Sequence, residues 1–267
     1  MIIIGERLNS SRRTVHDALV RRDETYFVEE ARLQEQAGAD YIDLNASALM
    51  DRELEALRWA VPLLQKNISV PLALDTPDAR AMEAAMELYK GRPLLNSLTG
   101  EKAKVESLLP LIRNFRPQVI VLCLDDTGLP VDARQALAVA QRMVELLSRH
   151  GISEQDIFID PLVRPLGVDS KAGSLFLESL KTIKKTLPGI KTVAGLSNVS
   201  FGLPERGLLN RTLLVLAMKT GLDAAICDPL DKELRAALAA ASALLGRDPL
   251  LKDFLRFYRE RKGSGGH

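Results

Sequence analysis

Short apolar runs alternate along this chain with longer segments in which apolar residues recur every three or four positions. Runs of the first kind are typical of buried β-strands, and segments of the second kind are typical of amphipathic helices. The strand-like runs read IIIG, YIDLN, VPLALD, PLLNS, QVIVLCLD, DIFID, KTVAGLS and LDAAICD. The helical segments are 14–21 with 24–36, 51–65, 79–89, 101–115, 132–150, 171–186, 204–220 and 231–245. The pattern therefore predicts eight consecutive strand–helix units.

Polar residues end or directly follow almost every strand-like run. They are Glu6, Asn9, Asp43, Asn45, Asp75, Asn96, Ser97, Asp125, Asp126, Asp160, Asn198 and Asp228. Polar side chains at the ends of buried strands are costly unless they face a shared cavity. Strands joined through helices run parallel, and eight units match a closed (β/α)8 TIM barrel, whose strand ends encircle one cavity. A doubly wound open sheet is the alternative, but it uses mainly its switch point, so the sequence favours the barrel.

A last helical segment, 249–262, follows the eight units. It carries Leu250, Leu251, Phe254, Leu255 and Tyr258 on one helical face. We expect this face to pack across the outside of the barrel, because a short helix of mixed charge buries too little surface to anchor in a membrane. Residues 1–262 are thus predicted to form a single domain, followed by a flexible tail at 263–267.

Composition narrows the choice of partners. A formal net charge of +1 with 27% charged residues leaves no basic stripe for nucleic acid, and one Trp and four Tyr offer few rings for stacking on bases. No apolar run approaches the ~20 residues that span a bilayer, and the opening MIIIGERLN lacks the charged region of a leader peptide. We therefore expect a cytoplasmic protein with neither a nucleic-acid nor a membrane partner.

The cysteines and histidines indicate neither disulfides nor a metal site. Cys123 and Cys227 lie inside expected strands, far from any CxxC spacing, so both are predicted to be buried and reduced. The three histidines, His16, His150 and His267, are not at strand ends. No histidine-based metal cluster or nucleophilic triad is expected.

Four of the strand-end residues are candidates for ligand binding. Asp75 and Asp160 follow apolar strands on opposite sides of the expected ring, where carboxylates suit a guanidine-like ligand edge. Asn96 and Asn198 offer both donors and acceptors, which suits a heterocycle with alternating N–H and carbonyl groups. The alternative for each residue is that it only caps the following helix, and this alternative weakens when four residues share one rim.

Each of the residues near these four could either contact a ligand or have a purely structural role. Asp43 and Asn45 are expected to support the site from behind it. Glu6, Arg7 and Asn9 are expected to form a buried ionic floor that fixes the first loop. Arg206 lies at the start of a helix, where a cation gains nothing from the helix dipole, so it is either a ligand contact or a solvated surface charge.

The motifs GERLN, DLN, LALDT, LLNS, IDPL and GLSNVSFG followed by LLNRT stand in this order along the chain. Together they resemble the pterin-binding methyltransferase family, including its methyltetrahydrofolate:corrinoid/iron–sulfur protein methyltransferases, from Ile2 to about Leu245. The resemblance implies a TIM barrel that acts in one-carbon metabolism and the acetyl-CoA pathway. It also implies a homodimer that docks a corrinoid (iron–sulfur) protein over the barrel mouth. LCLDDTG and Phe201 differ from more polar forms in this family, so the identity of the corrinoid partner stays open.

The resemblance also implies roles for individual residues. Asp75, Asn96 and Asp160 match positions that hold the pterin ring, and Arg206 matches an arginine that contacts tetrahydrofolate. Ser97 and Phe201 complete the predicted substrate-binding set. Asn198 matches the asparagine near the methyl-bearing N5 and is the predicted catalytic residue.

The implied reaction transfers the N5-methyl group of methyltetrahydrofolate to cob(I)alamin carried by the partner protein. The departing nitrogen must be protonated or strongly hydrogen-bonded, and no His, Cys or Lys stands at these strand ends. Asn198, with water and a neighbouring carboxylate, is therefore expected to stabilise the transition state.

Two other functions fit parts of the pattern. Dihydropteroate synthase shares the barrel and binds a related pterin, but GLSNVS stands here in place of the GxSRK-like strand end that carries the basic residue of that enzyme. A noncatalytic module that binds a pterin or a corrinoid protein would keep the same rim and show no turnover.

Overall fold

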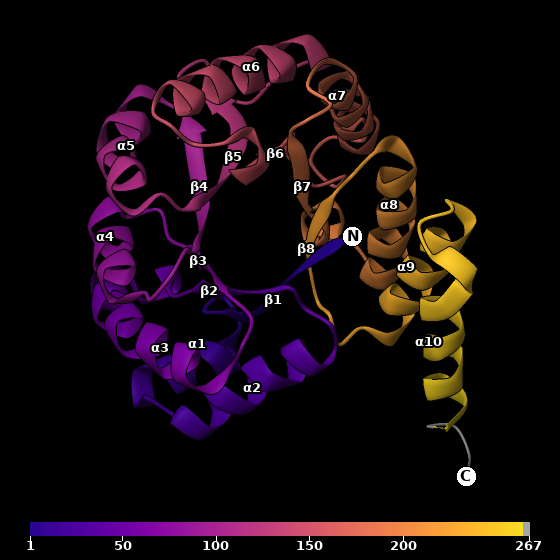
Figure 1. Cartoon of the computed structure of the whole chain (residues 1–267), viewed down its shortest axis with the longest axis horizontal. Helices are drawn as coiled ribbons and strands as arrows, with labels where there is room; N and C mark the ends of the chain where they lie inside the picture. Colours follow the sequence, from indigo (N-terminus) through magenta and orange to yellow (C-terminus); the bar gives the residue numbers. More distant parts are fainter. Residues whose placement is uncertain (264–267) are drawn as a thin grey trace.

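Eight parallel strands close into a barrel in chain order in the computed structural model, which describes residues 1–263 (Figure 1). The strands are β1 (Ile2–Asn9), β2 (Tyr41–Asn45), β3 (Leu72–Asp75), β4 (Leu94–Gly100), β5 (Gln118–Asp125), β6 (Ile157–Asp160), β7 (Lys191–Gly195) and β8 (Ala224–Cys227). Because β1 pairs with both β2 and β8, the sheet has no free edge. The predicted (β/α)8 barrel is confirmed, and the open sheet is wrong.

Helices surround the barrel on its outside (Figure 1). They are α1 (Arg13–Arg21), α2 (Glu24–Gln36), α3 (Glu53–Asn67), α4 (Ala79–Leu88), α5 (Lys102–Phe115), α6 (Ala133–Arg149), α7 (Ala172–Thr186), α8 (Arg206–Thr220) and α9 (Lys232–Leu244). Several begin one or two residues later than the sequence pattern suggests. At Asp132 and Asp231 the reason is capping, since each side chain accepts hydrogen bonds from the first helical N–H groups.

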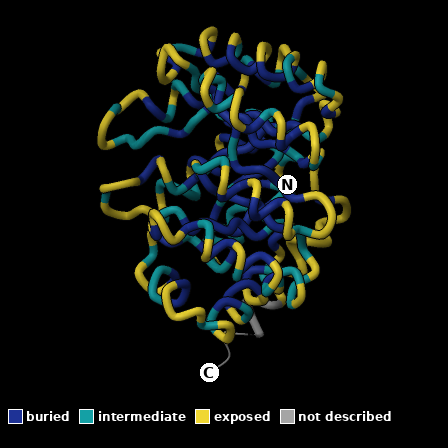
Figure 2. Tube along the Cα trace, turned by 90° about the vertical axis from the view of Figure 1, so that its left-hand side faces the viewer, coloured by how far each residue is buried: buried dark blue, intermediate teal, exposed yellow. Residues whose placement is uncertain are grey.

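The inside of the barrel is built in layers, because side chains of a strand alternate between the barrel interior and the surrounding helices. One layer is a separate apolar cluster of Ile4, Ala73, Leu94, Ile120, Phe158, Val193 and Ala224. Two residues further along four of these strands, and two residues after Tyr41 of β2, which packs against the cluster, the inward positions become polar. This polar layer consists of Glu6, Asp43, Asp75, Asn96 and Asp160. Figure 2 shows the buried trace concentrated in the centre and the exposed residues on the outer helices and loops.

Two strands are longer than the sequence pattern suggests. β1 continues past IIIG through Asn9, and β4 continues through Gly100 with a shift of register between Asn96 and Leu98. Glu6 and Asn9 are therefore strand residues rather than loop residues. This matters for Glu6, because its place in the strand turns its side chain into the barrel.

The last helix, α10 (Lys252–Gly263), does not pack as expected. Its contact with α9 uses Phe257, whose ring lies 5.4 Å from the Arg235 guanidinium carbon. The predicted packing face is solvent-exposed instead. Its exposed fractions are 82% for Leu250, 45% for Leu251, 36% for Phe254, 41% for Leu255 and 49% for Tyr258. Of the predicted tail, Gly263 ends α10, and residues 264–267 lie outside the described residues.

Candidate functional site

The mouth of the barrel, at the carboxyl ends of the strands, gathers the polar layer, which contains two side-chain hydrogen bonds. The Asn96 amide donates to Asp43 Oδ1 over 2.9 Å, and the Asn45 amide donates to Asp75 Oδ2 over 2.9 Å. Asp160 lies in the same layer on β6. The structure thus brings Asp75, Asn96 and Asp160 to one rim, as the sequence pattern predicts, and it places Asp43 and Asn45 behind them.

These bonds orient the groups that remain for a ligand. Because the Asn96 N–H group is directed at Asp43, its Oδ1 atom has no partner among the described residues and can accept from a ligand. Asn45 Oδ1 accepts from Ser10 Oγ, and from the N–H and hydroxyl of Ser47, so this side chain is fully used. Asn45 therefore fixes Asp75 and leaves the other Asp75 oxygen available.

Burial without a cationic partner raises the pKa values of the aspartates at the rim. Burial raises the pKa of Asp160 to about 7, against the hydrogen bond that its carboxylate accepts from Leu162 N at 2.7 Å. Burial likewise raises the pKa of Asp75 to about 6, with the Asn45 bond opposing and the charge of Glu53 adding to the effect. The pKa of Asp43 is raised further by burial and by neighbouring Asp75. A ligand that donates N–H groups would stabilise the charged forms of these carboxyls.

Asn198 occupies a different position from the other candidates. β7 ends at Gly195, and Asn198 lies in the short 3-10 helix η3 (Leu196–Ser200) that follows. Its side chain is exposed and makes no hydrogen bond within the described residues. A Cβ atom on Gly195 would lie 3.1 Å from the Asn198 amide nitrogen, so glycine leaves room for that amide at the strand end. The amide is available to a bound molecule.

Helix capping does not account for the four candidates. α8 begins at Arg206 after Glu205, which makes no side-chain capping bond. The other three helices that follow candidate-bearing strands are α4, α5 and α7, and their N-cap residues are Asp78, Glu101 and Lys171. None of these N-cap positions belongs to Asp75, Asn96, Asp160 or Asn198, so the alternative role considered from sequence is wrong for all four.

The remaining predicted substrate contacts lie close to Asn198 or Asn96. Arg206 donates two hydrogen bonds to the η3 turn, to Ser197 O at 3.0 Å and to Ser200 Oγ at 3.1 Å. Phe201 directly follows this turn and is 68% exposed. Ser97 lies next to Asn96 on β4 and is half-buried. Arg206 is therefore first a loop-fixing residue, and only its remaining nitrogen can reach a ligand.

The prediction that Glu6, Arg7 and Asn9 form a buried ionic floor is wrong for Glu6, whereas Arg7 does form ion pairs. Arg7 donates to Glu30 of α2 and, over 2.8 Å, to Asp228 beyond β8. Asn9 only accepts from Ser11 N at 2.9 Å. Glu6 takes no part, because it faces the barrel interior and binds Ser197 instead.

Sequence reasoning missed the helix acids Glu30 and Glu53. Both are buried, although they lie on helices where acidic residues are usually solvated. Glu30 holds Arg7, and Glu53, the first residue of α3, raises the pKa of Asp75 by its charge. The only signal was their position on helical faces that otherwise carry apolar residues.

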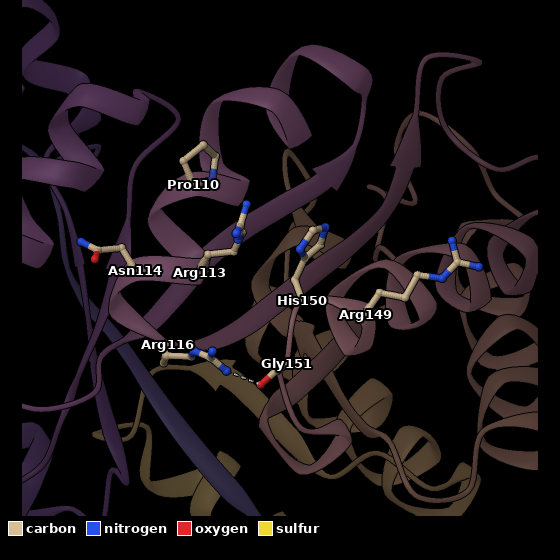
Figure 3. Close-up of a pocket in the computed structure, with 7 residues that line it drawn as sticks. All are labelled: Pro110, Arg113, Asn114, Arg116, Arg149, His150 and Gly151. Atoms are coloured by element: carbon tan, nitrogen blue, oxygen red, sulfur yellow. Dashed lines mark hydrogen bonds between the residues drawn. The ribbon is translucent and has the colours of Figure 1, made fainter.

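A second hollow lies at the opposite end of the barrel, between the ends of α5 and α6 (Figure 3). It measures about 640 Å³ and is lined by Pro110, Arg113, Asn114, Arg116, Arg149, His150 and Gly151. Arg116 donates to Gly151 O over 2.8 Å and joins the two loops. Cations at the last turns of two helices offset the partial negative charge of those ends, so this cluster has a structural explanation without a ligand.

The described residues contain neither a cluster of possible metal ligands nor a helix that could span a membrane. Among the side chains that the structure describes, in residues 1–259, no group of three or more His, Cys, Asp or Glu residues is arranged to hold a metal ion. Cys123 and Cys227 are free and buried, as predicted. In the same part of the chain, no helix combines the length and apolar character needed to cross a bilayer.

Comparison with known proteins relates this chain to pterin-binding enzymes. Residues 5–228 match the pterin binding enzyme family. The chain is 35% identical over 264 residues to the methylcorrinoid:tetrahydrofolate methyltransferase of Eubacterium limosum, covering 98% of this chain and 97% of that protein. It is 26% identical over 239 residues to methionine synthase of Mycobacterium tuberculosis, covering 85% of this chain but 20% of that protein.

Solved structures with the same architecture include dihydropteroate synthases. The enzyme from Yersinia pestis superimposes with a TM-score of 0.68 at 17% identity, covering 92% of this chain and 93% of that one. The enzyme from Xanthomonas albilineans in complex with 7,8-dihydropteroate gives 0.67 at 18% identity, covering 93% of each chain. At such identities the similarity establishes the fold alone.

Proposed function

The chain belongs to the pterin-binding enzyme family, and from that premise we propose that it is a methyltransferase acting between tetrahydrofolate and a corrinoid carried by a partner protein. The methyl group moves between N5 of the folate and the cobalt of the corrinoid. The observation that carries the proposal is the full-length relation to the methylcorrinoid:tetrahydrofolate methyltransferase. The name of that relative implies that the methylcorrinoid donates the methyl group, whereas the resemblance of the sequence motifs implies that methyltetrahydrofolate donates it. One site serves both directions of the reaction.

The geometry of the mouth suits a pterin. A pterin ring presents neighbouring N–H donors along one edge, which match the free oxygen of Asp75, the free Oδ1 of Asn96 and the carboxyl of Asp160. These three groups come from β3, β4 and β6 and are held by rigid strands rather than loops. The edge of the ring would therefore be buried, leaving N5 toward the open side where Asn198 lies.

The chain's own part in the reaction is to bind, orient and stabilise. The corrinoid supplies the cobalt that exchanges the methyl group. Asn198 offers an exposed amide with no competing protein partner, which suits a hydrogen bond to N5 as charge changes on that nitrogen.

The two alternative functions are weaker. Dihydropteroate synthase is supported only by fold, and GLSNVS in place of a GxSRK-like strand end removes its basic residue. A noncatalytic binding module would use the same rim and differ only in lacking turnover.

The direct test mixes the purified protein with methyltetrahydrofolate and photoreduced cobalamin and follows methylcobalamin absorbance. We expect enzyme-dependent formation of methylcobalamin, and in the reverse direction loss of methylcobalamin with tetrahydrofolate. Tight binding of methyltetrahydrofolate without turnover, with free cobalamin or with a corrinoid protein, would favour the binding module and contradict the proposal.

The proposal includes a homodimer, a cytoplasmic location, and neither a nucleic-acid nor a membrane partner. Support for the dimer comes from an exposed apolar patch formed by Leu250 and Leu251 of the 3-10 helix η4 (Pro249–Leu251) and by Phe254, Leu255 and Tyr258 of α10. In Figure 1, α10 lies on the outside of the barrel beside α9. Exposed apolar patches of this kind mark interfaces, and a side contact between two copies leaves the mouth open for the corrinoid protein.

We expect Leu255→Glu to convert the dimer into a monomer, because each copy would place a carboxylate in a buried apolar contact. Light scattering at working concentrations measures the change, with Val20→Glu on α1, 39% exposed, as a matched control. A wild-type monomer, or a dimer that Leu255→Glu leaves intact, would rule out this interface while leaving methyl transfer unaffected.

A further inference from the structure

Glu6 is the one member of the polar layer that bonds to the loop carrying Asn198. Ser197 Oγ donates to both oxygens of Glu6, at 2.7 Å for Oε2, although 191 residues separate the two in sequence. Glu6 belongs to β1 and Ser197 to the η3 turn beyond β7. The bond therefore crosses the end of β8, which lies between them in the barrel.

Ser197 is also held from the opposite side. Its carbonyl accepts from Arg206 Nη2 at 3.0 Å, while Arg206 Nε donates to Ser200 Oγ at 3.1 Å. One residue of the turn is thus fixed through its hydroxyl by β1 and through its carbonyl by α8. Asn198 is the next residue, and its own side chain has no partner among the described residues. The placement of its amide depends on how the backbone at Ser197 is held.

We propose that Glu6 is a positioning residue for the reaction: its carboxylate holds Ser197 and so keeps the Asn198 amide in place over the barrel mouth. This inference rests on the proposed function, in which Asn198 acts at N5. Glu6 touches neither reacting atom and works through the turn.

The tie is also expected to depend on pH. A carboxylate accepts the Ser197 hydroxyl with both oxygens, whereas a protonated carboxyl loses part of that capacity. Burial, the largest cause, and the charge of Asp228 raise the pKa of Glu6; the Ser197 bond and the charges of Arg206 and Arg12 oppose this rise. Asp43 and Cys227 also face Glu6. The turn should therefore loosen at a higher pH than a solvated glutamate would suggest.

The test compares Glu6→Ala, Glu6→Gln and Ser197→Ala by single-turnover methyl transfer and by methyltetrahydrofolate affinity. We expect Glu6→Ala and Ser197→Ala to slow transfer by about 10- to 100-fold with a smaller change in affinity, since a misplaced group costs rate. Glu6→Gln keeps an acceptor oxygen and should retain most of the rate. Glu83→Ala, an exposed glutamate on α4, is the matched control.

A double variant separates positioning from a general structural effect. In an Asn198→Ala background, Glu6→Ala should cause no further loss of rate, because the residue it positions is gone. An equal loss in both backgrounds, a loss of affinity as large as the loss of rate, or a normal rate per folded molecule would each overturn the inference.

Amide hydrogen exchange tests the Glu6–Ser197 contact without relying on methyl transfer, so it separates this inference from the proposed function. In the unliganded protein, Glu6→Ala and Ser197→Ala should speed exchange at the amides of Phe201 and Leu203, which bond within the turn to Asn198 O and Ser200 O. Unchanged exchange would refute the tie even if methyl transfer is established. Faster exchange in a protein without methyl transfer would preserve the tie and reject the function.

Discussion

Replacing Asn198 by alanine is expected to slow methyl transfer about 10²- to 10³-fold, or about 2.7–4 kcal/mol, the range for removing one preorganised donor to a charge that develops in the transition state. The affinity for methyltetrahydrofolate should fall by less. An interaction formed mainly in the transition state lowers the barrier, whereas one already made to bound substrate lowers the dissociation constant. The free amide of Asn198, exposed and without a protein partner, is the structural basis of this expectation.

Single-turnover rate and ligand affinity should be measured on the same folded sample. The structure predicts an unchanged melting temperature, because Asn198 does not cap α8 and makes no side-chain hydrogen bond in the described chain. Serine at position 198 is an informative comparison, since it keeps a donor but loses reach. A normal rate per folded molecule in the alanine variant would remove Asn198 from the mechanism.

The polar layer could be predicted from the sequence alone because side chains on a β-strand alternate between its two faces with a period of two residues. A residue two positions beyond a buried inward residue must face inward too, so Asp75 after Ala73 and Asp160 after Phe158 are directed into the same end of the barrel. Closure of the barrel then brings strands that are distant in sequence to one rim. By the same rule Asp43, two residues after Tyr41 on β2, faces inward, and it accepts a hydrogen bond from Asn96.

Contacts that depend on tertiary packing could not be predicted in this way. The bond between Ser197 and Glu6 joins two strands across a third, and no local pattern encodes it. The burial of Glu53 depends on the 3-10 turn that delays the start of α3. For α10, the apolar stripe predicted packing against the barrel, and the structure leaves these side chains exposed instead, because a local pattern does not specify which surface a helix meets.

Replacing Asp160 by asparagine is expected to weaken methyltetrahydrofolate binding while stabilising the unliganded protein at alkaline pH. The loss of a charged hydrogen-bond acceptor should cost about 1.5–3 kcal/mol of binding. The gain in stability follows from the pKa of Asp160, which burial raises from 3.8 to about 7. Between these values the folded protein holds a proton that the unfolded chain has released. The contribution is therefore fully present below pH 3.8 and is lost as the pH rises through about 7.

Asparagine does not titrate, so its stability relative to wild type should improve with pH by about 3 kcal/mol between pH 5 and pH 8, at about 1.4 kcal/mol for each unit up to about 7. Urea denaturation at the two pH values measures this difference. Asp125 is a control that should not respond over this range, because hydrogen bonds from Thr127 and Arg142 lower its pKa to about 2 and it is ionised in both folded and unfolded states at pH 5 and pH 8. Asp125→Asn should therefore show the same stability difference from wild type at both pH values, and its relative loss of stability should develop only between about pH 2 and the unfolded value of 3.8. Equal stability differences for Asp160→Asn at pH 5 and pH 8 would show that Asp160 is already ionised in the empty site, and unchanged ligand affinity would remove it from the pterin edge.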